Sequence, residues 1–172
     1  NFSLVLWDRR ERNLFAAVDR FGVNRLVYYE DNRVFLIASR IDALMRSGDI
    51  ASEVNPRAIA NFMNFGVNLA PETIIRRVHR LAPGSLLVAS AAGARVSKYW
   101  DMRYGIDTGA NEQRLSRELE ELVEASVARQ CKRDSLAETG AFLSGGTDSS
   151  TVVGMMSRLE RGPVQAFSIG FQ

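Results

Sequence analysis

The sequence has few of the residues on which several common kinds of site depend. Its 172 residues include one cysteine, Cys131, and one histidine, His79. A lone cysteine excludes a disulfide within the chain and suits a reducing compartment, so we expect a cytoplasmic protein. One histidine argues against a histidine-rich metal cluster and against a serine hydrolase triad. We expect Cys131 to pack in the interior and His79 to lie in an exposed strand or loop.

Long apolar runs and an excess of one charge are also lacking. No apolar stretch reaches the roughly 20 residues that cross a bilayer, and the first residues do not resemble a signal peptide. Lysine and arginine number 22 and acidic residues 20, so the net charge of +2 does not indicate nucleic-acid binding. The basic run at 76–80 is expected to be a solvated face. We therefore expect neither nucleic acid nor a membrane as a partner.

What is present describes a globular protein that buries a core. Apolar residues make up 46% of the chain, and the length suits one domain, or one domain and part of another. In the first hundred residues, β-rich runs separated by polar turns occupy 2–8, 14–18, 26–29 and 34–38. These four predict one antiparallel sheet. Ser39 is predicted to cap a short helix and Asn55-Pro56 to begin another. Two further strands are predicted at 85–90 and 95–100.

The periodicity changes around 101–110, where we place the connection between two units. Asn111 is a predicted N-cap for a long amphipathic helix. A strand at 141–143, a helix and a second strand at 164–169 follow, and this alternation predicts a parallel sheet. Two strands are too few for an independent doubly wound sheet. We therefore expect both units to be incomplete and the chain to be a fragment of a larger one.

The stretch after residue 143 combines several features of an anion site. The apolar strand stops at Gly145 and Gly146 and restarts as a helix, whose N-terminus presents unpaired N–H groups and a positive dipole end. Asp148 adds a carboxylate that suits Mg²⁺. Hydroxyl donors surround it: Ser144, Thr147, Ser149 and Ser150. The loop contains no lysine, so it is not a Walker-type phosphate loop.

The six residues from Ser144 to Ser149 match S-G-G-x-D-S, the signature of the PP-loop ATP pyrophosphatases. In that family the loop holds the β,γ-pyrophosphate while a substrate oxygen attacks the α-phosphorus, giving an adenylate and pyrophosphate. The alternative is an ordinary glycine turn followed by a Ser/Asp helix cap. The complete match, placed between a strand and a helix, favours the nucleotide site.

Together with the antiparallel unit, the chain resembles the class B, glutamine-hydrolysing asparagine synthetases over nearly its whole length. The stretches that carry the resemblance are Phe2–Asp8, Asp19–Val23 with Leu26–Tyr29, Ile37–Ser39 with Ile41–Leu44, Leu81–Gly84 and Tyr99–Asp101. The resemblance implies a fold class of α/β and α+β. Residues 1–108 would be the C-terminal part of an antiparallel, β-rich, Ntn-hydrolase-like glutamine amidotransferase domain. Residues 109–172 would be the N-terminal part of a parallel-sheet PP-loop synthetase domain of the adenine nucleotide α-hydrolase-like type.

The resemblance also implies a reaction and its ligands. Family members hydrolyse glutamine in the first domain and pass ammonia to the second. There, an aspartyl adenylate made from ATP is aminated to asparagine, with release of AMP and pyrophosphate. We therefore expect ATP and Mg²⁺ as cofactors, glutamine and aspartate as substrates, and we leave a homodimer open.

Site residues follow position by position from this resemblance. Asp19 matches the aspartate that holds the α-amino group of glutamine, and Leu143 and Ile169 match positions that flank the adenine. Asp148 would also hold Mg²⁺. The pyrophosphate site would consist of Ser144, Gly145, Gly146, Asp148 and Ser149.

Three departures from the family pattern leave alternatives open. Val18 stands where the family has arginine, and Asn24-Arg25 where it has Lys-Pro. The first residue is Asn1, whereas the family nucleophile is an N-terminal cysteine. No catalytic residue is therefore assigned, and we expect the fragment alone to be inactive. One alternative is a relative that activates another carboxylate, of the β-lactam synthetase or lasso-peptide cyclase type, with a degenerate glutaminase half. The other is a non-catalytic nucleotide-binding module.

Overall fold

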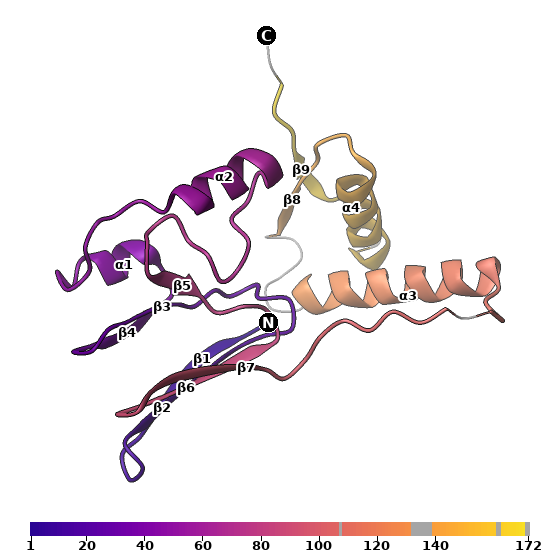
Figure 1. Ribbon diagram of the computed structural model, residues 1–172. Helices are drawn as coiled ribbons and strands as arrows, with labels where there is room; N and C mark the ends of the chain where they lie inside the picture. The colour runs from indigo at the N-terminus through magenta and orange to yellow at the C-terminus, as the bar shows by residue number, and fades with distance from the viewer. Residues whose placement is uncertain (107, 132–138, 161–162, 171–172) are drawn as a thin grey trace. The chain divides into compact units, whose positions relative to one another are not determined.

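The computed structural model describes residues 1–106, 108–131, 139–160 and 163–170 (Figure 1). The chain divides into two compact units, Asn1–Tyr104 and Gly105–Gln172. The first unit contains two antiparallel sheets and two helices, so the predicted mixed α/β class with antiparallel sheets is confirmed. The boundary at 108/109 stays a prediction. Among the described residues, no helix is long and apolar enough to cross a membrane.

One sheet of the first unit has the strand order β1-β2-β6-β7. Its strands are β1 (Ser3–Asp8), β2 (Asn13–Val18), β6 (Ser85–Ser90) and β7 (Gly93–Lys98). All neighbouring pairs are antiparallel. Asp8 closes the first hairpin because its Oδ1 accepts hydrogen bonds from the backbone N–H of Arg10 (2.8 Å) and Glu11 (3.1 Å).

The other sheet has the order β4-β3-β5 and contains β3 (Val27–Glu30), β4 (Phe35–Ala38) and β5 (Val78–Arg80). The predicted single sheet of four consecutive strands is therefore wrong. β2 pairs with β6 and β3 pairs with β5, across long connections that local patterns do not reveal. β5 lies in the basic run expected to be solvated, yet its Val78 is buried. His79 is in a strand, but it is partly buried against the ring of Tyr28 rather than exposed.

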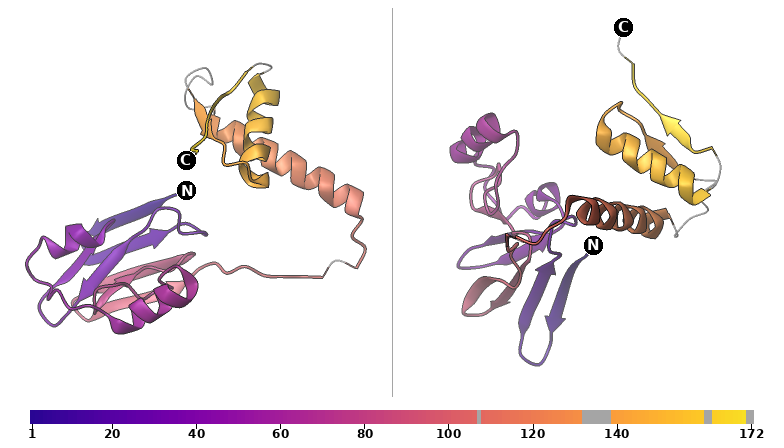
Figure 2. Two further views of the ribbon diagram at one scale, coloured as in Figure 1. Left: turned by 90° about the horizontal axis from the view of Figure 1, so that it is seen from above. Right: turned by 90° about the vertical axis from the view of Figure 1, so that its right-hand side faces the viewer.

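Alternation along β3 explains why the first unit has three layers. Val27 and Tyr29 pack with Leu44 in the cluster on the side of helix α1 (Ile41–Met45). Leu26 and Tyr28 belong to the cluster formed with β2 and β6. Successive side chains of a strand point to opposite faces, so β3 is covered on both sides. Figure 1 and the right-hand view of Figure 2 show this order of helices, three-stranded sheet and four-stranded sheet within the first unit.

The helix caps were only partly predictable. Helix α2 (Pro56–Phe65) begins as expected, with Asn55 Oδ1 accepting the N–H of Arg57 at 3.1 Å. Ser39 does not cap α1, because Arg40 occupies the N-cap position and no side chain bonds there. Asn111 does cap the long helix of the second unit, since its Oδ1 accepts the N–H of Arg114 at 3.2 Å.

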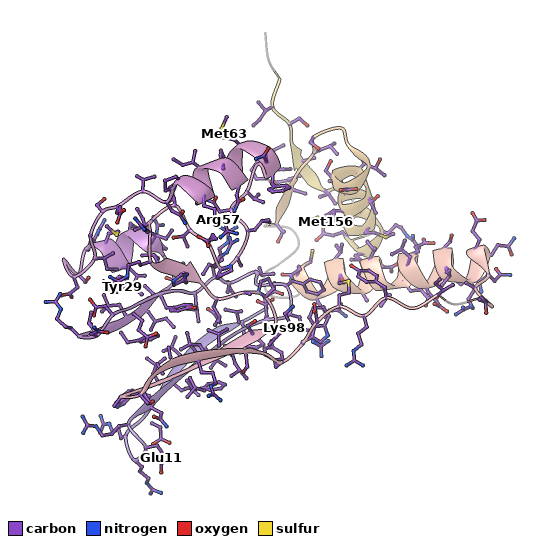
Figure 3. All side chains as sticks on the ribbon, viewed as in Figure 1. Glu11, Tyr29, Arg57, Met63, Lys98 and Met156 are labelled. Carbon is purple, nitrogen blue, oxygen red and sulfur yellow. The ribbon has the colours of Figure 1, made fainter. Side chains whose placement is uncertain are left out.

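The second unit consists of α3 (Glu112–Cys131), β8 (Gly140–Phe142), α4 (Thr147–Glu160) and β9 (Gln165–Phe167). β8 and β9 pair in parallel. The two helices pack through Val127, Cys131 and Met156, the last labelled on α4 in Figure 3. Cys131 is buried, as expected. The assignment of this unit to the PP-loop fold stays a prediction.

Candidate functional site

The loop that follows β8 begins at Leu143, whose backbone is hydrogen-bonded to residues at the end of β9. The N–H of Leu143 donates to the carbonyl of Phe167 at 2.8 Å, and Ser168 Oγ donates to the carbonyl of Leu143 at 2.7 Å. Both backbone groups of Leu143 are therefore tied to the end of β9. Sequence analysis missed Ser168, because a hydroxyl that bonds a distant backbone carbonyl leaves no local signature.

The backbone conformation favours glycine at position 145 of the loop, whereas no contact within the described structure requires glycine at position 146. Gly145 has φ = +81°, the left-handed region that favours glycine, although a Cβ there would meet nothing within 4 Å. A Cβ on Gly146 would lie 3.5 Å from Ser144 Oγ, an ordinary contact. The protein itself therefore tolerates a side chain at position 146, so any need for glycine there comes from what approaches the loop.

The side chain of Ser149 links the loop to the start of α4 through hydrogen bonds. Its Oγ accepts the N–H of Ser144 at 3.2 Å, lies 3.0 Å from Ser144 Oγ, and donates to the carbonyl of Gly146 at 3.2 Å. The N–H of Ser150 donates to the same carbonyl at 3.1 Å. These bonds bring the two serine hydroxyls together beside the helix N-terminus, whose first-turn N–H groups have no partners within the helix.

Asp148 lies in the first turn of α4 with an exposed carboxylate. Within the described ranges no hydrogen bond or ion pair engages this carboxylate, and no three His, Cys, Asp or Glu side chains gather to form a metal site. Mg²⁺ commonly uses one or two carboxylates together with substrate phosphates. The residues present therefore fit Mg²⁺ that is shared with a bound phosphate, and they do not form an all-protein cage.

The remaining predicted nucleotide residues lie at the ends of the two paired strands. Leu143 follows β8 directly and is partly buried, whereas Ile169 lies two residues beyond β9 and is 79% exposed. A cleft of about 580 Å³ opens nearby between the end of α3, β8 and α4, and Asp148 and Ser149 lie on its wall. All seven predicted nucleotide residues thus occur at one end of the parallel pair.

Asp19, the predicted glutamine residue, lies in the first unit directly after β2 and is buried. Its Oδ1 accepts the N–H of Phe21 at 3.0 Å and of Val23 at 3.4 Å, and its Oδ2 accepts the N–H of Phe2 at 3.2 Å. Burial acts to raise the pKa of Asp19, but these backbone hydrogen bonds outweigh it and hold the pKa below its usual value. Glutamine binding by Asp19 stays a prediction.

Comparison with known families covers both units. Residues 1–100 match the family model of the glutamine amidotransferase domain, and residues 118–172 match that of asparagine synthase. The chain belongs to the glutamine-hydrolysing asparagine synthetase family. The resemblance read from the sequence is thereby confirmed.

Relatives that are named asparagine synthetase and relatives with another name have similar sequence identity to this chain. A glutamine-hydrolysing asparagine synthetase of Bacillus subtilis is 28% identical over 99% of this chain and 28% of its own length. A putative asparagine synthetase of Methanocaldococcus jannaschii is 27% identical over 99% of the chain and 34% of its own length. An amidase of Gibberella zeae is 30% identical over 92% of the chain and 23% of its own length. The chain thus spans about a quarter to a third of the curated relatives that it matches.

Proposed function

We propose that this chain forms part of a glutamine-dependent amidotransferase that uses ATP to convert the aspartate side chain to an acyl adenylate. Ammonia then aminates the adenylate to asparagine, and AMP and pyrophosphate are released. One observation carries the proposal: a loop with the complete S-G-G-x-D-S pattern lies between β8 and the N-terminus of α4, in a chain of this family.

The loop offers the interactions that a leaving pyrophosphate requires. Free N–H groups of the first helical turn and the positive end of the helix dipole attract phosphate oxygens. The hydroxyls of Ser144 and Ser149 lie 3.0 Å apart and can turn toward an anion. Without a side chain, Gly146 lets phosphate approach the backbone closely. Stabilising charge as it develops on the leaving group lowers the barrier to attack at the α-phosphorus.

The metal and the base would be bound by residues next to this loop. Asp148 would be the protein ligand of Mg²⁺, which when bound supplies positive charge to the phosphate oxygens. Leu143 and Ile169 would enclose the flat adenine from the two strand ends, since apolar side chains and strand backbone suit that shape. Ser168 would keep Leu143 in place through its hydrogen bond to the carbonyl.

The glutamine half would use Asp19 to bind the α-amino group. Its low pKa keeps the carboxylate ionised, as a charge-assisted hydrogen bond requires. A carboxylate has about four acceptor positions. The three bonds from Phe2, Phe21 and Val23 occupy most of them but not all. No residue of this chain is assigned as the nucleophile for amide hydrolysis, because Cys131, the single cysteine of the sequence, is buried in the second unit.

A second candidate is activation of a carboxylate other than that of aspartate. Two fungal relatives at 29% and 30% identity carry the name amidase, so sequences this similar do not all bear the synthetase name. Val18 and Asn24-Arg25, which depart from the synthetase pattern in the glutamine half, favour the same reading.

Isotope transfer separates these candidates. The protein studied should carry this chain within the length of its relatives, and it should be supplied with MgATP, glutamine and aspartate labelled with ¹⁸O in the side-chain carboxylate. We expect one ¹⁸O atom in AMP, because the carboxylate oxygen that attacks phosphorus stays on it when the amide forms. Unlabelled AMP with aspartate, but labelled AMP with another acid, would select the second candidate.

A further inference from the structure

A second cavity lies in the first unit and does not include Asp19. It has a volume of about 500 Å³ and is enclosed by the start of β3, the start of α1, the end of α2 and the segment that leads into β5. Its wall combines positive charge with apolar surface. The charged members are Arg25, Arg40, Asp42, Glu72 and Arg80, and the apolar ones are Val27, Ile41, Phe62 and Val67.

The positive charges in this cavity exceed the negative ones. Arg40 is paired with Asp42 at 2.8 Å, and Glu72 accepts a hydrogen bond from Asn55 Nδ2 at 2.6 Å. Arg25 and Arg80 make no ion pair among the described residues, and within that part of the chain the Arg80 guanidinium donates only to the backbone carbonyl of Asn68. Two guanidinium groups on one wall therefore have no carboxylate partner.

The two arginines are close enough to affect each other. Burial lowers the pKa of Arg80, and the positive charge of Arg25 lowers it further. An anion between them would relieve this repulsion. The guanidinium fork suits a carboxylate or phosphate, and the hydroxyl of Ser39 on the same wall adds a donor.

We propose that this cavity binds a small organic oxyanion, with its carboxylate or phosphate head between Arg25 and Arg80 and its short apolar body against Val27, Phe62 and Val67. The proposal does not depend on the reaction assigned to the protein. Val27 is a buried core residue, whereas Phe62 and Val67 are half exposed, so the body enters from the solvent side.

Calorimetry with matched ligands tests the proposal on the 172-residue chain, whose fold is checked by circular dichroism and an amide NMR spectrum. The ligands are butyrate, its neutral analogue butyramide and inorganic phosphate. We expect saturable binding of butyrate at one molecule per chain, weaker binding of phosphate, and none of butyramide. Equal binding of butyrate and butyramide, or no binding of butyrate, would overturn the proposal. Phosphate that bound as tightly as butyrate would overturn the role of the apolar wall.

Variants with matched controls locate the site. Arg25→Ala removes an exposed guanidinium and is expected to weaken butyrate binding about tenfold. Arg10→Ala removes an equal charge from the β1–β2 turn and should leave affinity within about twofold. Val67→Glu would place a carboxylate at the cavity and abolish binding, whereas Val96→Glu on β7 would not. Equal effects of either variant and its control would show that the ligand binds elsewhere.

Discussion

Asp19 is bound by backbone N–H groups from both the start of the chain and the turn that follows β2. It therefore connects Phe2 to the segment containing Phe21 and Val23, and its own N–H donates to the carbonyl of Phe2 at 2.9 Å. A carboxylate held in this way has a structural role whether or not it also binds an amino group. Its protonation then affects stability.

Protonation of Asp19 is expected to make the stability of the chain depend on pH. The folded-state pKa of Asp19 lies below the unfolded value, so the stabilisation is fully present above the unfolded pKa and is lost as pH falls through the folded pKa. Asp19→Asn should therefore destabilise the chain near neutral pH and matter progressively less below about pH 4. Urea unfolding of both proteins at neutral and acidic pH measures the difference. A difference that did not shrink with acid would contradict the assignment.

The loop glycines give a second prediction. Gly146→Ala adds a Cβ that meets only an ordinary contact, so the fold should keep its stability while MgATP binding weakens at least tenfold. Gly145→Ala is the matched comparison, because it should cost roughly 1–2 kcal/mol through its left-handed conformation. Thermal unfolding with and without MgATP reports both quantities. If Gly146→Ala bound MgATP normally, close approach of phosphate at this residue would be ruled out.

Among the elements, α3 and α4 are held together by apolar packing more than by their ion pairs. Met156 is buried between them, whereas Arg158 forms exposed pairs with Glu120 at 2.5 Å and Glu124 at 3.6 Å. Met156→Ala is expected to cost about 2–5 kcal/mol of unfolding free energy, and Arg158→Ala less than about 1 kcal/mol. Denaturant titrations of the two variants decide this. A loss of unfolding free energy in Arg158→Ala as large as that in Met156→Ala, or larger, would contradict the dominance of apolar packing.

Elements defined by local signals were predictable from the sequence, and those defined by distant pairing were not. The caps at Asn55 and Asn111 follow from side chains next to the helices they begin. The division of the seven strands β1 to β7 into two sheets depends on β5, a three-residue strand with one fully buried apolar side chain, Val78. Its pairing with β3 spans about fifty residues of chain, which no local periodicity encodes.

Some residues of the candidate site could likewise be predicted from a local sequence pattern, whereas others depend on the pairing of distant strands. The glycines, hydroxyls and Asp148 of the loop form a contiguous pattern between a strand and a helix, so they could be recognised directly. Ser168 could not, because its role depends on the pairing of β8 with β9. The cavity lined by Arg25 and Arg80 could not be predicted either, since these residues come together only when β3 and β5 pair.

For the whole molecule, we predict that the 172-residue chain hydrolyses no glutamine. Amide hydrolysis of this type needs a thiol with a base within reach, and the only thiol, Cys131, is buried in the second unit. Glutamate release by the purified chain, measured with and without thiol alkylation, should equal the uncatalysed rate. Release that alkylation abolished would show that a nucleophile has been overlooked.

In the proposed reaction, the loop from Ser144 to Ser149 holds the pyrophosphate of ATP while the α-phosphorus is attacked. The most direct measurement is the nucleotide product formed by a protein that carries this chain within the length of its relatives. We expect AMP and pyrophosphate in equal amounts, and we expect Asp148→Ala to abolish both while leaving the fold intact. Formation of ADP and phosphate as the stoichiometric products would rule out attack at the α-phosphorus, and unchanged turnover in Asp148→Ala would rule out the metal role of Asp148.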